Sequence, residues 1–454
     1  MRSHLRCLGH SPGSLLLGDL ITSSLLPLVM LSSMLPSSSV SMVYTNLCRA
    51  SLGLGLSAWL TYITDLGPDS SSERSISLPH LGAAALTLFL FPSSTRTNTY
   101  IIYWAIICLR PLTMWLVSKF PQSFSFGEAT LICQSCILVS ASILLKLFSL
   151  EEITMKAVII QLVKDLEWLV DHLLSSSSTV VLLLMFWVFL VVLSVSVVAL
   201  YHQQGWEVNT KTRKLFHLAV VLVYVSGKLP SSVSVGIFII NCVILQYPHI
   251  FYYRPACFCF TKFSILGLVY SPVLLYISSI AALVFMVSIE AVRWSQAIPP
   301  VSYFLTEALQ PFLDSKDGGS LILTNIYLLV GVSWPLWVYP GPMSVQPSPL
   351  VLYCGVISVG VADSAASIVG STAGRLMWPG SDKTVEGSLA AVISSLGFVW
   401  AMSALGLVTV GGWSAVIMAV LGMVITEALS KQVDNLTLPL VMYGLLTFAQ
   451  YKQF

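Results

Sequence analysis

The sequence predicts an all-α, polytopic integral membrane helix bundle with roughly 11–14 transmembrane helices, and its composition is the first basis. Of the 454 residues, 56% are hydrophobic and only 9% are charged. The mean hydropathy is +0.86. A soluble globular domain carries about 25% charged residues. So few charges could not cover a soluble protein of this size. Soluble enzymes, disordered chains and nucleic-acid-binding proteins with a basic face are therefore excluded.

Apolar runs that recur along the whole chain are the second basis, because they exclude one anchor attached to a soluble domain. A spanning helix needs about 20 apolar residues, and lipid permits only helices or closed barrels. These runs are continuous rather than alternating, which predicts helices. The candidate spans are 14–35, 40–63, 79–92, 98–118, 127–149, 179–200, 215–228, 231–250, 264–290, 320–339, 349–370, 388–409, 412–429 and 436–450.

The polar stretches divide the chain into two predicted domains. Residues 1–200 form an N-terminal multispanning region, in which the pattern of 151–178 predicts an amphipathic interfacial helix. Residues 201–454 form a C-terminal catalytic membrane domain, because its connectors carry most of the candidate chemistry.

Charge alternates between the connectors of the second domain, and this alternation predicts its topology. The segment 211–214, the 290–319 loop, the 371–387 loop and Lys431 carry positive charge, whereas 338–350 and 409–413 carry none. The charged connectors should share one face of the membrane. The positive-inside rule makes that face cytosolic.

Asp363 is the first candidate functional residue, because it lies inside an apolar run eight residues before its polar end. An ionisable group at membrane depth is costly and marks a functional site by default. The alternative is a hydrogen-bonded contact between helices, aided by the small residues around it.

The 371–387 loop combines groups that suit a nucleotide phosphate. Its glycines allow close backbone approach, its hydroxyls donate hydrogen bonds, and Arg375 and Lys383 supply positive charge. The string GSDKT is not a Walker A loop, since the G-x-x-x-x-G-K-[ST] spacing and the preceding strand are missing. An ordinary Gly-rich connector is the alternative.

Several acids near the membrane edge are candidates for a metal ligand or a base. Asp363 and Glu386 could hold a divalent ion, since Mg²⁺ takes one or two protein carboxylates. Glu290, Glu427 and Asp434 are further candidates for the base. Helical spacing predicts an intrahelical pair of Glu427 with Lys431, with Asp434 near the same face.

Four segments of the second half carry a family resemblance: TKTRKLFHL (210–218), FLDSKDGGSLILTNIYLLVG (312–331), VADSAASIVGSTAGRLMWPGSDKTVEGS (361–388) and LSKQVDNLTLPL (429–440). In this order they closely resemble dolichol kinases, the CTP-dependent polyprenol kinases of the endoplasmic reticulum, over residues 205–450. The part from Asp363 to Ser388 also resembles phytol kinases and, more distantly, phosphatidate cytidylyltransferases. The W-P-G-S-x-K-T-x-E-G-S form points to the dolichol branch.

The chain departs from the family pattern in three places. Ala362 stands where the family usually has glycine, and Asp382 adds a negative charge beside Lys383. The third departure is larger, because about 38 residues near 229–267 have no counterpart in the family. We interpret 229–267 as an insertion.

The resemblance implies transfer of the γ-phosphate of CTP to dolichol, giving CDP and the dolichyl phosphate used for the sugar donors of protein glycosylation. For this reaction we assign catalytic roles to Asp363, Glu386 and Lys383, with Asp363 and Glu386 holding a divalent metal, expected to be Mg²⁺. The family's loop equivalent to 371–386 is implicated in CTP binding. The residues expected to bind the nucleotide are Ser371, Gly374, Arg375, Trp378, Pro379, Gly380, Ser381, Lys383, Thr384, Gly387, Lys214 and His217.

The expected partners are dolichol, CTP and membrane lipids, with no nucleic acid, and the sequence does not fix an oligomeric state. The expected location is the endoplasmic reticulum membrane, multi-pass, with the catalytic loop facing the cytosol. Two alternatives stay open. One is a kinase of a shorter isoprenoid alcohol of the phytol or farnesol type. The other is an ion-coupled transporter, although the inverted repeats of such proteins are not visible.

Overall fold

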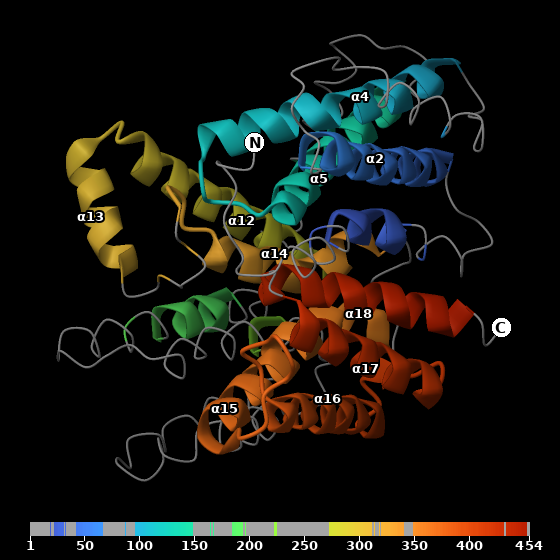
Figure 1. Cartoon of the computed structure of the whole chain (residues 1–454), viewed down its shortest axis with the longest axis vertical. Coiled ribbons are helices and arrows are strands. Elements are labelled where there is room, and N and C mark those ends of the chain that lie inside the picture. Colours follow the sequence, from blue (N-terminus) through green and yellow to red (C-terminus); the bar gives the residue numbers. More distant parts are fainter. Residues whose placement is uncertain are drawn as a thin grey trace.

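Helices make up nearly all the regular structure of the computed structural model (Figure 1). The structure describes residues 42–66, 96–148, 184–193, 272–310, 319–339, 348–430 and 433–451, with short pieces at 19, 22–30, 32, 87, 164, 167, 196, 222–224, 313 and 317. The predicted interfacial helix at 151–178, except for 164 and 167, and the predicted insertion at 229–267 lie outside this part.

The predicted polytopic helix bundle is confirmed. Within the described residues, five helices are long and apolar enough to cross a membrane: Asn98–Lys119, Phe126–Leu145, Leu274–Ser295, Val356–Ala373 and Val385–Ala404. Shorter apolar helices cover Leu184–Leu193, Thr324–Val338 and Trp413–Leu429. The predicted number of 11–14 refers to the whole chain, and the candidate spans 215–228 and 231–250 lie wholly or largely outside the described residues.

The N-terminal helices form one group that packs against the C-terminal ones (Figure 1). This group contains α2 (Met42–Leu66), α4 (Arg96–Lys119) and α5 (Phe126–Phe148), which contact one another. Residues at the upstream end of the chain also reach the C-terminal helix, where Thr447 donates a hydrogen bond to Ser32 Oγ at 2.8 Å.

The C-terminal group begins with α12 (Pro272–Ser295), α13 (Pro299–Leu309) and α14 (Thr324–Val338). It continues with η4 (Leu350–Tyr353), η5 (Val356–Asp363), α15 (Ser364–Ala373), α16 (Val385–Ala404), α17 (Trp413–Leu429) and α18 (Asp434–Tyr451). The connector expected as a loop at 290–319 thus contains a helix, α13. Its first two residues are prolines, which the first turn of a helix tolerates.

Two connectors meet at one end of the C-terminal group as a small parallel sheet. Strand β1 (Ser348–Pro349) pairs with β2 (Val408–Thr409). These strands belong to, or border, the two uncharged connectors, which therefore lie at the same end of the group. The opposite end holds the charged connectors described below.

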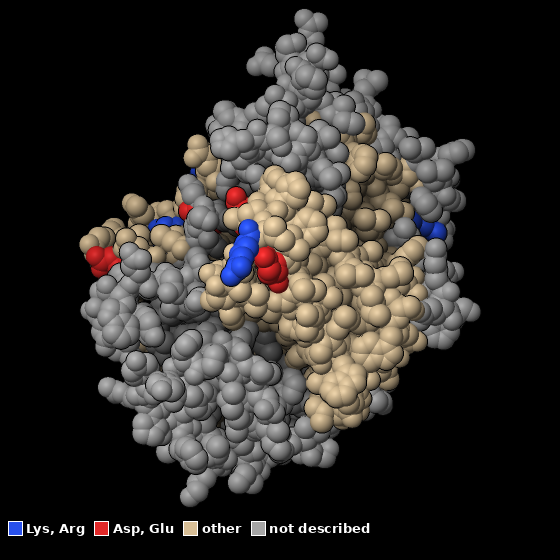
Figure 2. Space-filling view, turned by 60° about the horizontal axis from the view of Figure 1, so that its bottom comes forward, with Lys and Arg blue, Asp and Glu red and all other residues tan. Residues whose placement is uncertain are grey.

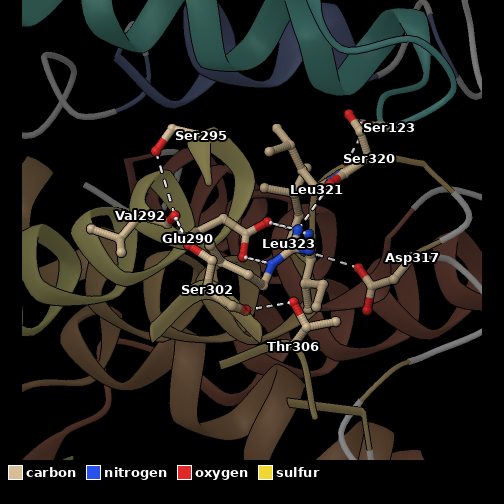
Figure 3. A network of polar contacts seen from close by, with 12 residues as sticks. Ser123, Glu290, Val292, Ser295, Ser302, Thr306, Asp317, Ser320, Leu321 and Leu323 are labelled. Carbon is tan, nitrogen blue, oxygen red and sulfur yellow. Dashed lines mark hydrogen bonds and ion pairs between the residues drawn. The ribbon is translucent and has the colours of Figure 1, made fainter. Parts of the chain in front are cut away.

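A polar network joins α12 to the segment that precedes α14 (Figure 3). Arg293 Nε donates to Glu290 Oε2 at 2.8 Å, and Glu290 Oε1 accepts from the Ile322 N–H at 2.7 Å. Asp317 Oδ1 accepts from two backbone N–H groups at the start of α14, those of Leu323 and Thr324. Within the polar DSKDGGS segment, Asp317 therefore has a structural role at the start of α14.

Close packing of α14 on α18 fixes the position of the first turn of α18. A Cβ atom added at Gly331 would collide with the backbone carbonyl of Asn435. We expect Gly331→Ala to destabilise the protein by about 1–3 kcal/mol, since overpacking forces backbone shifts. Thermal unfolding in detergent measures this. Gly397→Ala is the matched control, because an added Cβ there meets nothing within 4 Å. Equal melting temperatures for both variants would contradict this description of the contact.

Candidate active site

The helix that carries Asp363 is irregular, although the sequence predicts a regular span at 349–370. It starts as a 3₁₀ turn, widens into the π-helical η5 and becomes α-helical at Ser364. Ser358 Oγ donates to the carbonyl of Cys354 at 2.7 Å inside the wide segment. π-Helical segments are rare and frequently occur at functional sites. Asp363 is the last residue of this one and is only 7% exposed.

The connector between α15 and α16 is shorter than the predicted 371–387 loop. Since α15 runs to Ala373 and α16 begins at Val385, only 374–384 is loop. Backbone hydrogen bonds join the two ends of this loop. The Trp378 N–H donates to the Lys383 carbonyl at 2.9 Å. The Val385 N–H likewise donates to the Leu376 carbonyl at 2.8 Å. The loop therefore has a defined shape.

Its tip is a turn built from the W-P-G-S segment. The Ser381 N–H donates to the Trp378 carbonyl at 3.1 Å, and Gly380 has φ of +73°. A type II turn requires positive φ at its third residue and favours proline at its second. Pro379 and Gly380 therefore set the turn, and the turn directs the following Lys383 back toward the helices.

Three other glycines of the motif lie where α15 packs on α16. A Cβ at Gly387 would come within 2.8 Å of the Ala366 carbonyl oxygen, and one at Gly370 within 2.9 Å of Thr384 Oγ1. A Cβ at Gly374 would collide with the Gly370 carbonyl. Close helix packing thus accounts for these glycines, whether or not the backbone also approaches a phosphate.

The start of α16 is capped by motif residues. Thr384 Oγ1 accepts from the Gly387 N–H at 3.2 Å, as an N-cap residue does. The carboxylate of Glu386, in the first turn, accepts from the Leu376 N–H at 3.2 Å. Trp378 Nε1 donates to Ser388 Oγ at 3.0 Å. These bonds tie the loop to the helix that follows it.

Lys383 lies at the centre of an acidic cluster formed by three further elements. Its Nζ lies 2.9 Å from Asp434 Oδ2 and 3.4 Å from Glu427 Oε1. Asp363 is close enough to act on its charge. The lysine side chain is 35% exposed, whereas those of Glu427 and Asp434 are 4% and 14% exposed. The cluster thus joins the 374–384 loop to η5, α17 and α18 at one end of the group.

Asp434 is the main reason why the pKa of Lys383 is raised above its ordinary value. Burial opposes this shift, and the charges of Glu427 and Asp363 add to it. Opposite charges favour the charged form of a titratable group. Lys383 therefore stays positively charged throughout the neutral pH range, as a group that binds phosphate must.

The predicted pairing of Glu427 within its own helix is wrong. Helix α17 ends at Leu429, and Asp434 begins a separate helix, so helical spacing does not connect these residues. Glu427 contacts Lys383 instead, 44 residues earlier in the chain. Lys431 lies outside the described residues.

The predicted site residues fall into three groups. Asp363 and Lys383 lie in the cluster. The loop and its flanking turns hold Ser371, Gly374, Arg375, Trp378, Pro379, Gly380, Ser381, Thr384, Glu386 and Gly387. Lys214 and His217 lie outside the described residues. Glu427 and Asp434, which the sequence offered only as candidates for the base, complete the cluster. Their sequence context indicates a site role, because each is an acid at the polar end of an apolar run.

Charged and apolar side chains lie close together on the described surface at the loop. Figure 2 shows one face of the molecule, on whose described part charged side chains are scattered and, near the centre, a basic side chain lies against an acidic one. Apolar side chains such as Leu376 and Met377 are exposed at the loop, at 65% and 64%. A charged site bordered by exposed apolar groups suits a reaction between a polar and a lipid substrate.

The carboxylates are suited to a divalent ion only together with ligands from a substrate. Among the described residues, no group of three His, Cys, Asp or Glu side chains is placed to hold a metal. Mg²⁺ usually takes one or two protein carboxylates and fills its remaining positions with water and phosphate oxygens. Asp363 and Glu386 fit this chemistry as hard oxygen ligands.

The chain is similar to curated dolichol kinases. It is 37% identical to the mouse dolichol kinase over 191 residues, which cover 40% of this chain and 35% of the relative. It is 32% identical to the human dolichol kinase over 297 residues, 62% of this chain and 47% of the relative. The Arabidopsis thaliana relative, "Dolichol kinase EVAN", is 27% identical over 285 residues, or 62% of this chain and 42% of the relative.

No family model and no solved structure matches the chain. The chain spans less than half the length of the curated relatives described above. Within that limit the resemblance expected from the four sequence segments is confirmed, and the chain is similar to dolichol kinases.

Proposed function

We propose that the protein phosphorylates dolichol with CTP at the cytosolic face of the endoplasmic reticulum membrane. The products are dolichyl phosphate, for the sugar donors of protein glycosylation, and CDP. The observation that carries this proposal is the cluster of Lys383 with Asp363, Glu427 and Asp434. It lies where the loop that resembles a CTP-binding loop meets the ends of apolar helices. CTP as donor and dolichol as acceptor come from the similarity to dolichol kinases.

In this proposal the positive groups of the loop bind the triphosphate. Lys383 is permanently charged and partly exposed, and Arg375 is exposed at the start of the same loop. Phosphoryl transfer depends mainly on in-line positioning and on neutralising the charge of the phosphoryl oxygens. Ser371, Ser381 and Thr384 are the hydroxyl groups proposed to assist these positive groups. Lys214 and His217 are proposed to line the same opening.

Asp363 and Glu386 are the proposed ligands of a divalent ion, expected to be Mg²⁺. When bound, such an ion neutralises charge on the phosphate oxygens. The Glu386 carboxylate already accepts the Leu376 N–H, but a carboxylate has lone pairs to spare. Asp363 is buried close to Lys383, so an ion held by Asp363 would lie near the group proposed to bind the phosphates.

The alcohol fits this architecture for a physical reason. A polyprenol keeps its isoprenoid chain in lipid, and its hydroxyl lies at the level of the lipid headgroups. The triphosphate is a soluble polyanion. A charged cluster at the end of a group of membrane helices allows the alcohol and the triphosphate to meet. The isoprenoid chain then stays in lipid and the triphosphate stays in water.

A panel of isoprenoid alcohols tests the proposed substrate. Protein purified in detergent should phosphorylate long polyprenols with CTP, and more slowly or not at all the short phytol and farnesol. Faster phosphorylation of phytol or farnesol would show that the substrate is a shorter isoprenoid alcohol and not dolichol. No phosphorylation of any alcohol, together with ion-driven solute uptake by proteoliposomes, would favour the transporter.

The cytosolic orientation of the loop is a separate prediction. Glycosylation-acceptor tags inserted into 374–384 should remain without glycan, because the positive-inside rule places this loop opposite the lumen. A tag inserted in 340–347 is the matched control and should be glycosylated, since this uncharged connector leads to the other end of the group. If the 374–384 tag received glycan and the control tag did not, the loop would face the lumen and the predicted orientation would be wrong.

A further inference from the structure

Glu427 is the acid of the cluster whose position its structural contacts do not explain. It lies two residues before the end of α17, on the buried face of that helix, and is only 3% exposed. One carboxylate oxygen, Oε1, accepts from Lys383 Nζ at 3.4 Å. The other oxygen, Oε2, is buried and has no hydrogen-bond partner within the described part of the chain.

A buried carboxylate oxygen without a partner is unfavourable. Buried polar atoms in native proteins nearly always have a hydrogen-bond partner, and each exception needs a reason. Leaving such a group unpaired destabilises the protein more than an average hydrogen bond stabilises it. The described part of the chain therefore leaves this oxygen without the hydrogen bond that its burial calls for.

The other acids of this region do not share that property. Asp434 Oδ2 accepts from Lys383 at 2.9 Å, and Asp434 starts α18, where a helix N-terminus stabilises negative charge. Glu290 binds Arg293 and the Ile322 N–H. Glu386 accepts the Leu376 N–H. Among the described acids, only Glu427 has a buried oxygen without a partner.

We propose that Glu427 is the general base of the reaction, with Oε2 accepting the proton of the substrate hydroxyl. This inference rests on the proposed function. As the proton moves to Oε2, the alcohol oxygen forms a bond to the terminal phosphorus of the nucleoside triphosphate. The bond from that phosphorus to the bridging oxygen breaks, and the nucleoside diphosphate leaves with its electron pair. Glu427 then releases the proton to water.

The shared lysine contact places base and phosphate together. Lys383 touches Glu427 through one oxygen, so a phosphate bound by Lys383 lies beside the second oxygen of the same carboxylate. A base must lie within hydrogen-bond reach of the proton that it removes. Asp434 holds the lysine from the other side and is a positioning residue.

Glu427→Gln tests the proposal, because glutamine keeps the size and the oxygen facing Lys383 but cannot take a proton. General-base catalysis contributes about 10²–10⁴-fold, so kcat should fall by at least about 100-fold with little change in the KM for CTP. Asp434→Asn is the matched control. It should mainly raise that KM, because it loosens Lys383. Wild-type kcat in Glu427→Gln would overturn the proposal.

A pH profile separates a base from a structural acid. The kcat of the wild type should fall on the acid side as Glu427 is protonated, and the residual activity of Glu427→Gln should lack this limb. Glu427→Asp keeps a carboxylate and covers the case in which the glutamine variant does not fold. Glu427→Asp should show the same acid limb of the pH profile with a lower kcat. A wild-type kcat in Glu427→Asp would contradict the proposal. A wild type without kinase activity would instead refute the proposed function.

Discussion

Asp363→Asn is expected to lower kcat by about 100-fold or more while the protein stays folded. The substitution keeps the volume of the side chain and removes its negative charge. Asp363 ends the π-helical segment, is 7% exposed and acts on the charge of Lys383. If it holds the divalent ion or orients the hydroxyl, an amide cannot replace it, and lost acid–base or metal chemistry is worth about this factor.

Steady-state kinetics and a melting curve in detergent check this expectation. The matched control is Ser364→Ala, the next residue, whose buried hydroxyl has no hydrogen-bond partner among the described residues. It should keep nearly full activity. If Asp363 only joins helices, asparagine can still form hydrogen bonds, and Asp363→Asn would turn over at nearly the wild-type rate. That result would reject the catalytic assignment.

Lys383→Ala should raise the KM for CTP by about 10- to 100-fold and change kcat less. A hydrogen bond to a charged group contributes about 1.5–3 kcal/mol, and a phosphate-binding cation acts in the ground state and the transition state alike. Asp382→Asn is the matched control. It removes an exposed negative charge from the same loop, so the KM should fall modestly.

The acidic cluster adds a structural effect to the loss of Lys383. Its ammonium group binds Asp434 and Glu427, and breaking a buried pair by removing one partner destabilises a protein. Lys383→Ala should therefore melt at a lower temperature, and adding Asp434→Asn should recover part of the loss. An unchanged KM for CTP in a folded Lys383→Ala protein would contradict the phosphate-binding role.

Local sequence patterns predicted several elements and identified Asp363 and Lys383 as site residues, with Glu427 and Asp434 only as candidates for the base. The spans at 98–118, 127–149 and 412–429 match α4, α5 and α17 closely, because long continuous apolar runs leave the backbone little choice in lipid. Asp363 and Lys383 were identified from an intramembrane charge and a positively charged loop. Both signals lie within one stretch of about 30 residues.

Contacts between distant segments could not be predicted in the same way. Lys383 meets acids that are 44 and 51 positions later in the chain, and helical spacing suggested a different partner for Glu427. That expectation failed because α17 ends at Leu429, before the spacing could continue. The π-helical turn before Asp363 was also not predicted, since hydrophobic periodicity does not distinguish it from an α-helix.

The most direct test of the account follows the terminal phosphate of CTP into the lipid. Purified protein is incubated with dolichol and CTP labelled in the γ position, and the products are separated into organic and aqueous phases. The account predicts label in dolichyl phosphate in the organic phase and unlabelled CDP in the aqueous phase, whereas CTP labelled in the α position leaves the lipid unlabelled. Label in the lipid from α-labelled CTP would indicate cytidylyl transfer, and no label in the lipid from either would contradict a kinase.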